Sequence, residues 1–135
     1  YMGTSYDIDA NGNTVHVVGT GRVTGGELME TSMALSANPK LMPNMATLVD
    51  FSAVEDMDVT PTCVRELVAY LFGVRDTRGK SRQAFVVNRT GIALMIDLYI
   101  LSCANAGLPH EVRLFQTKSE ATEWLGIGVE QYSAA

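Results

Sequence analysis

The chain has 135 residues, of which 47% are hydrophobic and 19% are charged, and its formal net charge at pH 7 is -5. This length suits one domain whose core is large enough to fold without disulfides or metals. The acidic balance and the scattered Lys and Arg residues exclude a broad phosphate-binding surface. We therefore expect no nucleic acid partner.

No membrane or secretory segment is expected. The start of the chain lacks the basic and apolar regions of a signal peptide. The most apolar segment, residues 92–101, contains Asp97 and is far shorter than the roughly 20 residues of a membrane span. Cys63 and Cys103 are distant in sequence and both lie in predicted helices, which favours free thiols and a cytoplasmic protein.

The first part of the chain predicts a hairpin, a helix and a buried strand. Two strands, residues 5–9 and 14–22, flank an Asn-Gly-Asn turn whose residues tolerate positive φ. A Thr-Gly-Gly-Glu capping box begins a helix over residues 24–37, and an Asn-Pro pair ends it. The apolar run 46–51 predicts a strand buried on both faces.

The rest of the chain alternates helices with strands. Three helices are expected to begin at the threonine caps Thr60, Thr90 and Thr117. Strands are expected over residues 83–88 and 112–116. The order β-β-α-β-α-β-α-β-α predicts an α/β fold with a mixed sheet, mainly parallel, and an antiparallel hairpin at one edge.

The predicted elements form one domain over residues 5–126. Residues 1–4 and 127–135 lie outside them, and we expect both termini to be flexible.

An acidic segment after the first buried strand is the main candidate for catalysis. It is expected to be a loop, residues 52–58, with Glu55, Asp56 and Asp58 in it and Asp50 just before it. Such carboxylates could hold a hard cation or share a proton, but their spacing is irregular and exposed acidic loops are usually only solvated. We expect no metal, no cofactor and no catalytic residues.

The predicted helix over residues 91–106 is apolar on nearly every side. Such a helix needs cover from the sheet and from a second surface. A homodimer through this helix is the simplest cover. The alternative is an apolar ligand between this helix and its neighbour, lined by Met29, Met33, Phe72 and Met95.

The stretch VDFSAVEDMDVTP, residues 49–61, resembles the strand, loop and helix start of STAS domains, the anti-sigma-factor-antagonist type of regulatory module. Those domains read roughly L-D-L-S-G-V and then D-S-S-G. With its NGN hairpin, GRVTGGEL helix start and VRLFQTKSEATEWLG ending, the chain is also similar to the SpoIIAA-like relatives. The resemblance implies a STAS-like fold, related in architecture to the lipid-binding CRAL-TRIO domains.

The resemblance also implies functional positions. Asp50 and Ser52 match the family's D-x-S, Asp58 matches the acid before the switch hydroxyls, and Thr60 matches the second hydroxyl, where a phosphate would meet a helix N-terminus. Val59 replaces the first hydroxyl and Pro61 replaces the glycine, so kinase recognition departs from the family pattern.

We therefore predict a non-enzymatic regulatory or protein-interaction module. Its binding edge is predicted to comprise Asp50, Ser52, Asp58, Thr60, Asn88 and Arg89, with Thr60 as a possible site of phosphorylation. The alternative function is a carrier or sensor of a lipid or another small apolar molecule.

Overall fold

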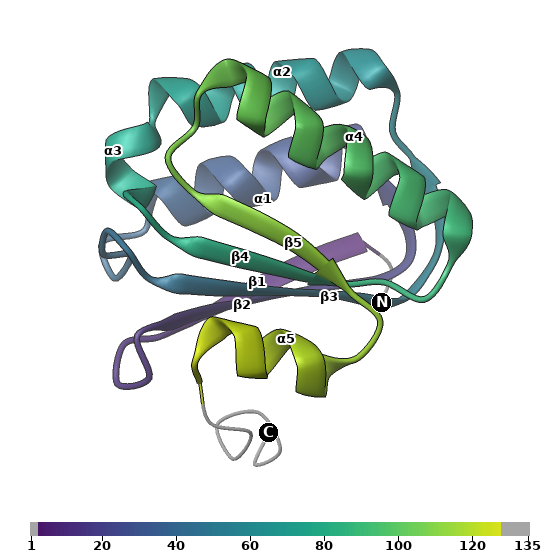
Figure 1. Ribbon diagram of the computed structural model, residues 1–135. Helices are drawn as coiled ribbons and strands as arrows, with labels where there is room; N and C mark the ends of the chain where they lie inside the picture. The colour runs from purple at the N-terminus through teal and green to yellow at the C-terminus, as the bar shows by residue number, and fades with distance from the viewer. Residues whose placement is uncertain (1–2, 128–135) are drawn as a thin grey trace.

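Five strands pair in the order in which they occur along the chain. The computed structural model describes residues 3–127, and its strands are β1 (Gly3–Asp9), β2 (Thr14–Thr24), β3 (Ala46–Asp58), β4 (Arg82–Val86) and β5 (Glu111–Phe115). They form one sheet with the order β1-β2-β3-β4-β5 (Figure 1). β1 and β2 are antiparallel, and every later pair is parallel. The predicted α/β class and its antiparallel edge hairpin are confirmed.

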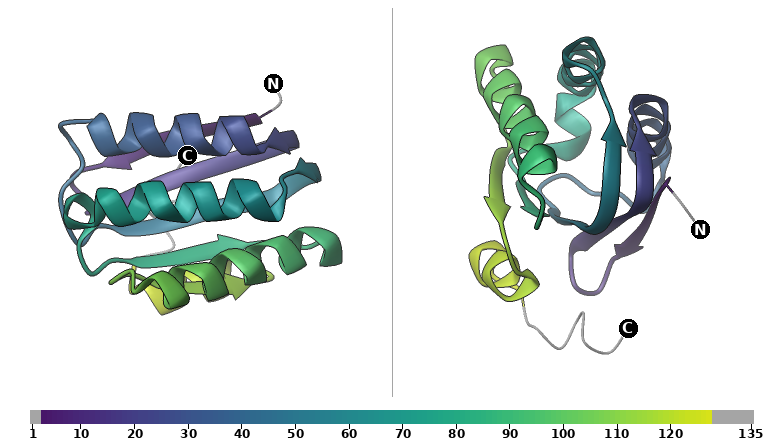
Figure 2. Two further views of the ribbon diagram at one scale, coloured as in Figure 1. Left: turned by 90° about the horizontal axis from the view of Figure 1, so that it is seen from above. Right: turned by 90° about the vertical axis from the view of Figure 1, so that its right-hand side faces the viewer.

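The helices are divided unequally between the two faces of the sheet. They are α1 (Gly25–Ala37), α2 (Pro61–Gly73), α3 (Arg75–Arg78), α4 (Thr90–Ala106) and α5 (Lys118–Leu125). α1, α2 and α4 lie side by side on one face, whereas α5 lies on the other (Figures 1 and 2). The short α3 continues from α2 and leads into β4. No helix in residues 3–127 is long and apolar enough to cross a membrane.

Side-chain caps begin three of the helices as predicted. Thr24 forms the capping box, because its hydroxyl accepts from the Glu27 amide and its own amide donates to Glu27. The Thr60 and Thr117 hydroxyls each accept from the amide three residues later, at 3.1 and 3.2 Å. At the start of α5, the Thr117 hydroxyl also donates to the Glu120 carboxylate at 3.0 Å.

The predicted Thr90 cap is wrong by one residue. Arg89 has the extended backbone of an N-cap, and its carbonyl accepts from the Ala93 amide at 2.9 Å. The first turn therefore closes on Arg89, which makes no side-chain capping bond, and Thr90 is already helical. This helix begins without a hydroxyl cap.

The acidic segment is a strand rather than the predicted loop. β3 continues to Asp58 because β2 also continues, and the two strands pair to their ends, from Thr14 with Ala46 to Thr24 with Asp58. The register shifts twice along this ladder, as at β-bulges. The long pairing places Arg22 of β2 beside the acidic residues of β3.

Side chains of the central strands alternate between two cores. Val49, Phe51 and Phe85 belong to the larger core, which includes buried residues of α1, α2 and α4. The smaller core joins strand residues to buried residues of α5. It consists of Leu48, Ala84, Val86, Ala121 and Leu125. This confirms that the strand predicted over residues 46–51 is buried on both faces, and residues 84–86 of β4 are buried in the same way.

The described ends of the chain belong to the fold. β1 begins at Gly3, two residues before the predicted start, and Thr4 is buried. At the other end, the Ile127 amide donates to the Thr122 carbonyl at 3.1 Å. The predicted flexibility of residues 1–2 and 128–135 lies outside the described residues.

Candidate functional site

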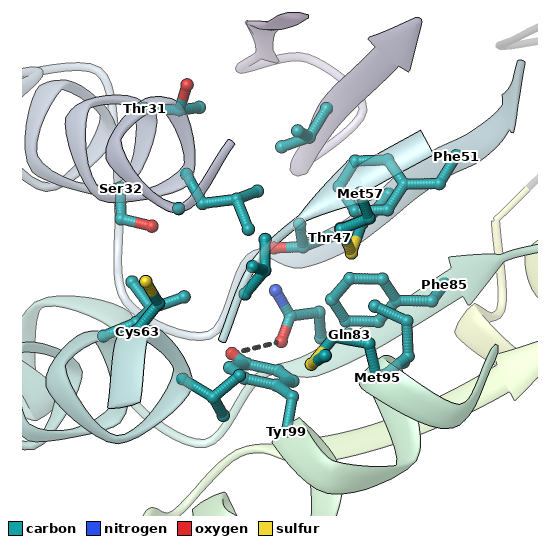
Figure 3. Close-up of a pocket in the computed structure, with 18 of the residues that line it drawn as sticks. Thr31, Ser32, Thr47, Phe51, Met57, Cys63, Gln83, Phe85, Met95 and Tyr99 are labelled. Atoms are coloured by element: carbon teal, nitrogen blue, oxygen red, sulfur yellow. Dashed lines mark hydrogen bonds between the residues drawn. The ribbon is translucent and has the colours of Figure 1, made fainter. Parts of the chain in front are cut away.

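A cavity lies between the sheet and the helices α1, α2 and α4 (Figure 3). Its volume is about 90 Å³ and it is partly open to solvent. Its lining is mainly apolar, with aliphatic, aromatic and methionine side chains from the sheet and all three helices. Polar side chains are fewer, and they include Thr31, Ser32, Thr47, Arg78, Gln83 and Tyr99.

Four of these polar residues meet near the amino ends of the strands. Thr47 and Gln83 are register partners at the beginning of β3 and β4. The Arg78 guanidinium donates to the Thr47 hydroxyl at 2.6 Å. The Tyr99 hydroxyl donates to the Gln83 side-chain carbonyl at 3.1 Å (Figure 3). We call this group, Thr47, Arg78, Gln83 and Tyr99, the polar end of the cavity.

Arg78 is the charged member of the polar end. It is only 8% exposed, and no ion pair within residues 3–127 involves it. Burial lowers the pKa of Arg78, while the nearby Tyr99 acts in the opposite direction. An arginine stays protonated at neutral pH because its ordinary pKa is so high. The cavity is therefore lined by a buried positive charge.

His110 lies close enough to Arg78 for the two side chains to interact electrostatically. Burial, and then repulsion by Arg78, lower the pKa of His110 to about 4. Its Nε2 atom is buried and has no hydrogen-bond partner among residues 3–127. At neutral pH, His110 is therefore uncharged and adds no second positive charge at the polar end.

The other end of the cavity is apolar and adaptable. Phe51 and Tyr99 both contact the Phe85 ring edge to face, with ring centroids 5.8 and 5.6 Å apart. Met57 and Met95 also line the cavity and are only partly buried. Methionine side chains change shape easily because three of their bonds rotate freely. The apolar end can therefore adjust to what it contains.

Cys63 forms part of the cavity wall where α1 and α2 approach each other. A Cβ atom placed on Gly25 would lie 2.7 Å from the Cys63 sulfur, so only glycine fits there without a shift. The Thr60 hydroxyl donates to this sulfur at 3.2 Å, and this bond is the main cause of the lowered pKa of Cys63. The thiol is free and partly buried.

The predicted ligand lining was only partly right. Met95 lines the cavity, but Met29 does not, and Met33 and Phe72 are exposed on the surface at 50% and 40%. Sequence reasoning missed the polar end altogether. The one available signal was Tyr99, whose hydroxyl interrupts an otherwise apolar row of the helix.

Asp50 and Ser52 lie together, on the face of the sheet that carries α5. One Asp50 oxygen accepts from the Ser52 amide at 3.0 Å and from the Ser52 hydroxyl at 2.6 Å. The other lies 3.3 Å from the Lys118 ammonium. Burial opposes ionisation of Asp50, but the bonds from Ser52 and Lys118 together lower its pKa. This carboxylate is satisfied within the fold.

Asp58 and Thr60 lie at the far end of β3. Asp58 accepts from the Arg22 guanidinium at 2.7 Å, and Asp56 lies 3.7 Å from the same side chain. Two acidic side chains, Asp56 and Asp58, thus converge on the Arg22 guanidinium. No group of three or more His, Cys, Asp or Glu in the described part of the chain is placed to hold a metal ion. Thr60 is exposed and caps α2, and its phosphorylation stays a prediction.

Asn88 and Arg89 line a shallow groove of about 450 Å³ where β4 and β5 end. The groove also includes Thr90, Asp97 and Glu120. Within residues 3–127, no hydrogen bond or ion pair joins the three groups Asp50 with Ser52, Asp58 with Thr60, and Asn88 with Arg89. The binding edge over these six residues stays a prediction.

Comparison with known proteins supports the fold. No family model matches the chain, and no curated protein matches it. Among solved structures, it is similar to an uncharacterised DUF3478-family protein with a SpoIIAA-like fold from Shewanella loihica PV-4. The TM-score is 0.59 with 16% sequence identity, and the match covers 93% of this chain and 95% of the other. The chain therefore has the SpoIIAA-like fold that its sequence suggested.

Proposed function

We propose that this chain is a non-enzymatic binding module of the STAS-like type, whose ligand is a small, largely apolar molecule held in the cavity. The observation that carries the proposal is the cavity itself, since a core without a binding role is packed with few voids larger than a water molecule. Small-molecule sites are characteristically apolar with a few polar groups that orient the ligand, and this cavity has that composition.

The size of the cavity limits the ligand. At about 90 Å³ it is smaller than the cavity of roughly 150 Å³ that accommodates benzene in a well-studied case. Because the cavity is partly open and bordered by the flexible Met57 and Met95, it suits a short, narrow molecule of about the size of benzene or smaller. A longer chain would have to displace the flexible side chains of Met57 and Met95. We therefore propose a sensor or carrier of a short molecule rather than of a full membrane lipid.

Titration with neutral alcohols tests this function. We expect 1-butanol to change the backbone amide resonances of cavity-lining residues in 1H–15N spectra. Ser32→Phe should abolish the change, because Ser32 lines the cavity and a phenyl ring there would fill it. Met33→Phe is the matched control, since Met33 is adjacent but 50% exposed. Equal responses in both variants, or none in the wild type, would contradict the proposal.

A protein-interaction role through α4 is the second candidate. Leu94 and Leu101 are 64% and 58% exposed, and they lie two turns apart on one side of this helix. The next helix, α2, adds the exposed Phe72, so apolar surface extends across both helices. We propose a second copy of this chain as the partner.

Sedimentation of the Leu94→Glu and Leu101→Glu double variant tests this contact. We expect a dimer for the wild type and a monomer for the variant. Met33→Glu, which places a charge on the exposed side of α1, should remain dimeric. A wild-type protein that sediments as a monomer at all concentrations would exclude the homodimer.

We also propose that the protein resides in the cytoplasm. Cys63 and Cys103 are both free thiols, and the cytoplasm keeps thiols reduced.

A further inference from the structure

The polar end of the cavity carries a positive charge that no side chain of residues 3–127 balances. Arg78 has five N–H donors, yet within residues 3–127 its guanidinium donates only to the Thr47 hydroxyl. An arginine buried to this extent normally has a carboxylate partner, because removing a charge from water is costly unless an opposite charge compensates. Here no ion pair within residues 3–127 involves Arg78.

The ionisable neighbours of Arg78 cannot supply the missing negative charge. Burial raises the pKa of Tyr99 well above its usual value, so its hydroxyl stays protonated at neutral pH. Cys103, which contacts Tyr99, has its pKa raised to about 11 by burial and is also neutral. His110 is neutral or positive at every pH. The compensating group must come from outside the side chains of the described fold.

We propose that the cavity binds a short-chain carboxylate, with the carboxylate against Arg78 and the hydrocarbon part toward Phe85 and Met95. This inference rests on the proposed function of the cavity as a ligand site and names the chemical class of the ligand. The planar guanidinium matches a carboxylate, because two parallel N–H groups can meet its two oxygens. Thr47 and Tyr99 lie beside Arg78 and supply hydroxyls at the same end.

The surroundings of Arg78 favour a carboxylate over a phosphate. A phosphate carries nearly two negative charges, and phosphate sites usually add helix N-termini or further cations. The long helices of this fold begin at the carboxyl ends of the strands, whereas Arg78 is the last residue of α3 and lies at the amino ends. A single arginine there matches a single negative charge.

Butanoate and butanamide are the probes that test the ligand class. They have nearly the same shape, but only butanoate is charged at neutral pH. The dissociation constant of each is measured from 1H–15N spectra of the wild type, Arg78→Met and Arg75→Met. Arg75 is the matched control because it belongs to the same short helix but is exposed.

We expect the wild type and Arg75→Met to bind butanoate at least tenfold more tightly than butanamide. Arg78→Met should lose this preference and keep its affinity for butanamide. If Arg78→Met does not fold, the dissociation constants of the wild type for butanoate and butanamide still test the inference. Equal affinities for both probes in the wild type would overturn the inference.

The alcohol titration separates this inference from the proposed function. If butanol binds in the cavity but butanoate does not, the carboxylate inference is wrong and the binding module stands. If neither butanol, butanoate nor butanamide changes any cavity resonance, both proposals are wrong. If butanoate binds and its effects map to exposed lysines instead of the cavity, the carboxylate inference is also wrong.

Discussion

The two faces of the sheet each bury a charged side chain, but they treat it differently. On the α5 face, Asp50 accepts two hydrogen bonds from Ser52 and pairs with Lys118. On the face covered by α1, α2 and α4, Arg78 lines a cavity and forms no ion pair within residues 3–127. A buried charge whose partners are all present holds the fold together. One that lacks a counter-charge beside an open space is available to a ligand.

The cavity lies in the larger of the two cores. The smaller core under α5 contains Leu48 and Ala121, both fully buried at 0% exposure. The larger core contains the cavity and is bordered by partly buried methionines. Asp50, which the family resemblance singled out, is the buried charge whose partners are present, whereas Arg78 matches no part of the quoted family pattern.

Leu48→Ala should give the largest loss of stability. Leu48 is fully buried in the core under α5, and truncating such a leucine costs about 3 to 4 kcal/mol through lost burial and the void left behind. Urea denaturation of the variant measures this loss. A loss of less than about 1 kcal/mol would show that the core under α5 is loosely packed, which would contradict the contrast between the two faces.

Acidification should weaken the cavity face. His110 has an ordinary pKa near 6.5 when unfolded and about 4 in the fold, so the unfolded chain takes up the proton first. Its contribution to stability is therefore complete above pH 6.5 and is lost as the pH falls toward 4. The shift corresponds to about 3 kcal/mol.

Denaturation between pH 4 and 7 of the wild type and His110→Gln isolates this effect. The difference between the two proteins should shrink with falling pH, because the variant has no proton to gain at this position. Arg78→Met should also flatten the wild-type curve, since Arg78 repels the charged form of His110. If the stability of the wild type and of His110→Gln changed with pH in parallel, the lowered pKa of His110 would be contradicted.

Replacing Asp50 should lower the stability of the fold, whereas replacing Arg78 should not. Asp50→Ala removes a carboxylate that accepts charged and neutral hydrogen bonds, and we expect a loss of about 2 kcal/mol. Arg78→Met removes a buried charge without a counter-ion and replaces it with an apolar side chain of similar length. We expect its stability to stay within about 1 kcal/mol of the wild type or to rise.

Thermal and urea denaturation of both variants without added carboxylate measures this contrast. If Arg78→Met lowered the free energy of unfolding more than Asp50→Ala, Arg78 would be the buried charge that stabilises the fold, and the contrast between the two faces would be wrong.

Arg82→Met should give the smallest effect. The exposed Arg82 donates to the Trp124 carbonyl at 2.8 Å and lies over the Trp124 ring, at 5.2 Å from its centroid. Exposed contacts of this kind contribute about 0.5 to 1 kcal/mol. Arg113, at the same distance from the ring, remains in the variant. A loss above 2 kcal/mol would mean that α5 depends on this surface contact more than on its core.

Local sequence patterns predicted most of the fold. The Asn-Gly-Asn turn, the Thr24 capping box and the alternation of strands with helices depend on neighbouring residues, so they could be recognised without the structure. The continuation of β3 through the acidic segment could not. It depends on pairing with β2, some 30 residues earlier in the chain. Three acidic residues in close succession favoured a loop, and tertiary pairing overrode that preference.

The candidate site was less predictable for the same reason. Arg78 belongs to the stretch RDTRGK, which has the composition of an exposed turn. Its burial follows from the way α3 turns back toward β3, where the Asn44 amide donates to the Arg78 carbonyl at 2.8 Å. Neither that contact nor the proximity of Thr47 can be inferred from spacing along the chain.

The sequential order of the strands has a consequence for how the protein forms. Every strand pairs with the one before it, so no later segment has to insert between strands that are already joined. A chain emerging from the ribosome can complete the hairpin first and then add one helix and one strand at a time to the same growing edge. Contacts between segments close in sequence shorten the search, and folding should be fast for a mainly parallel sheet.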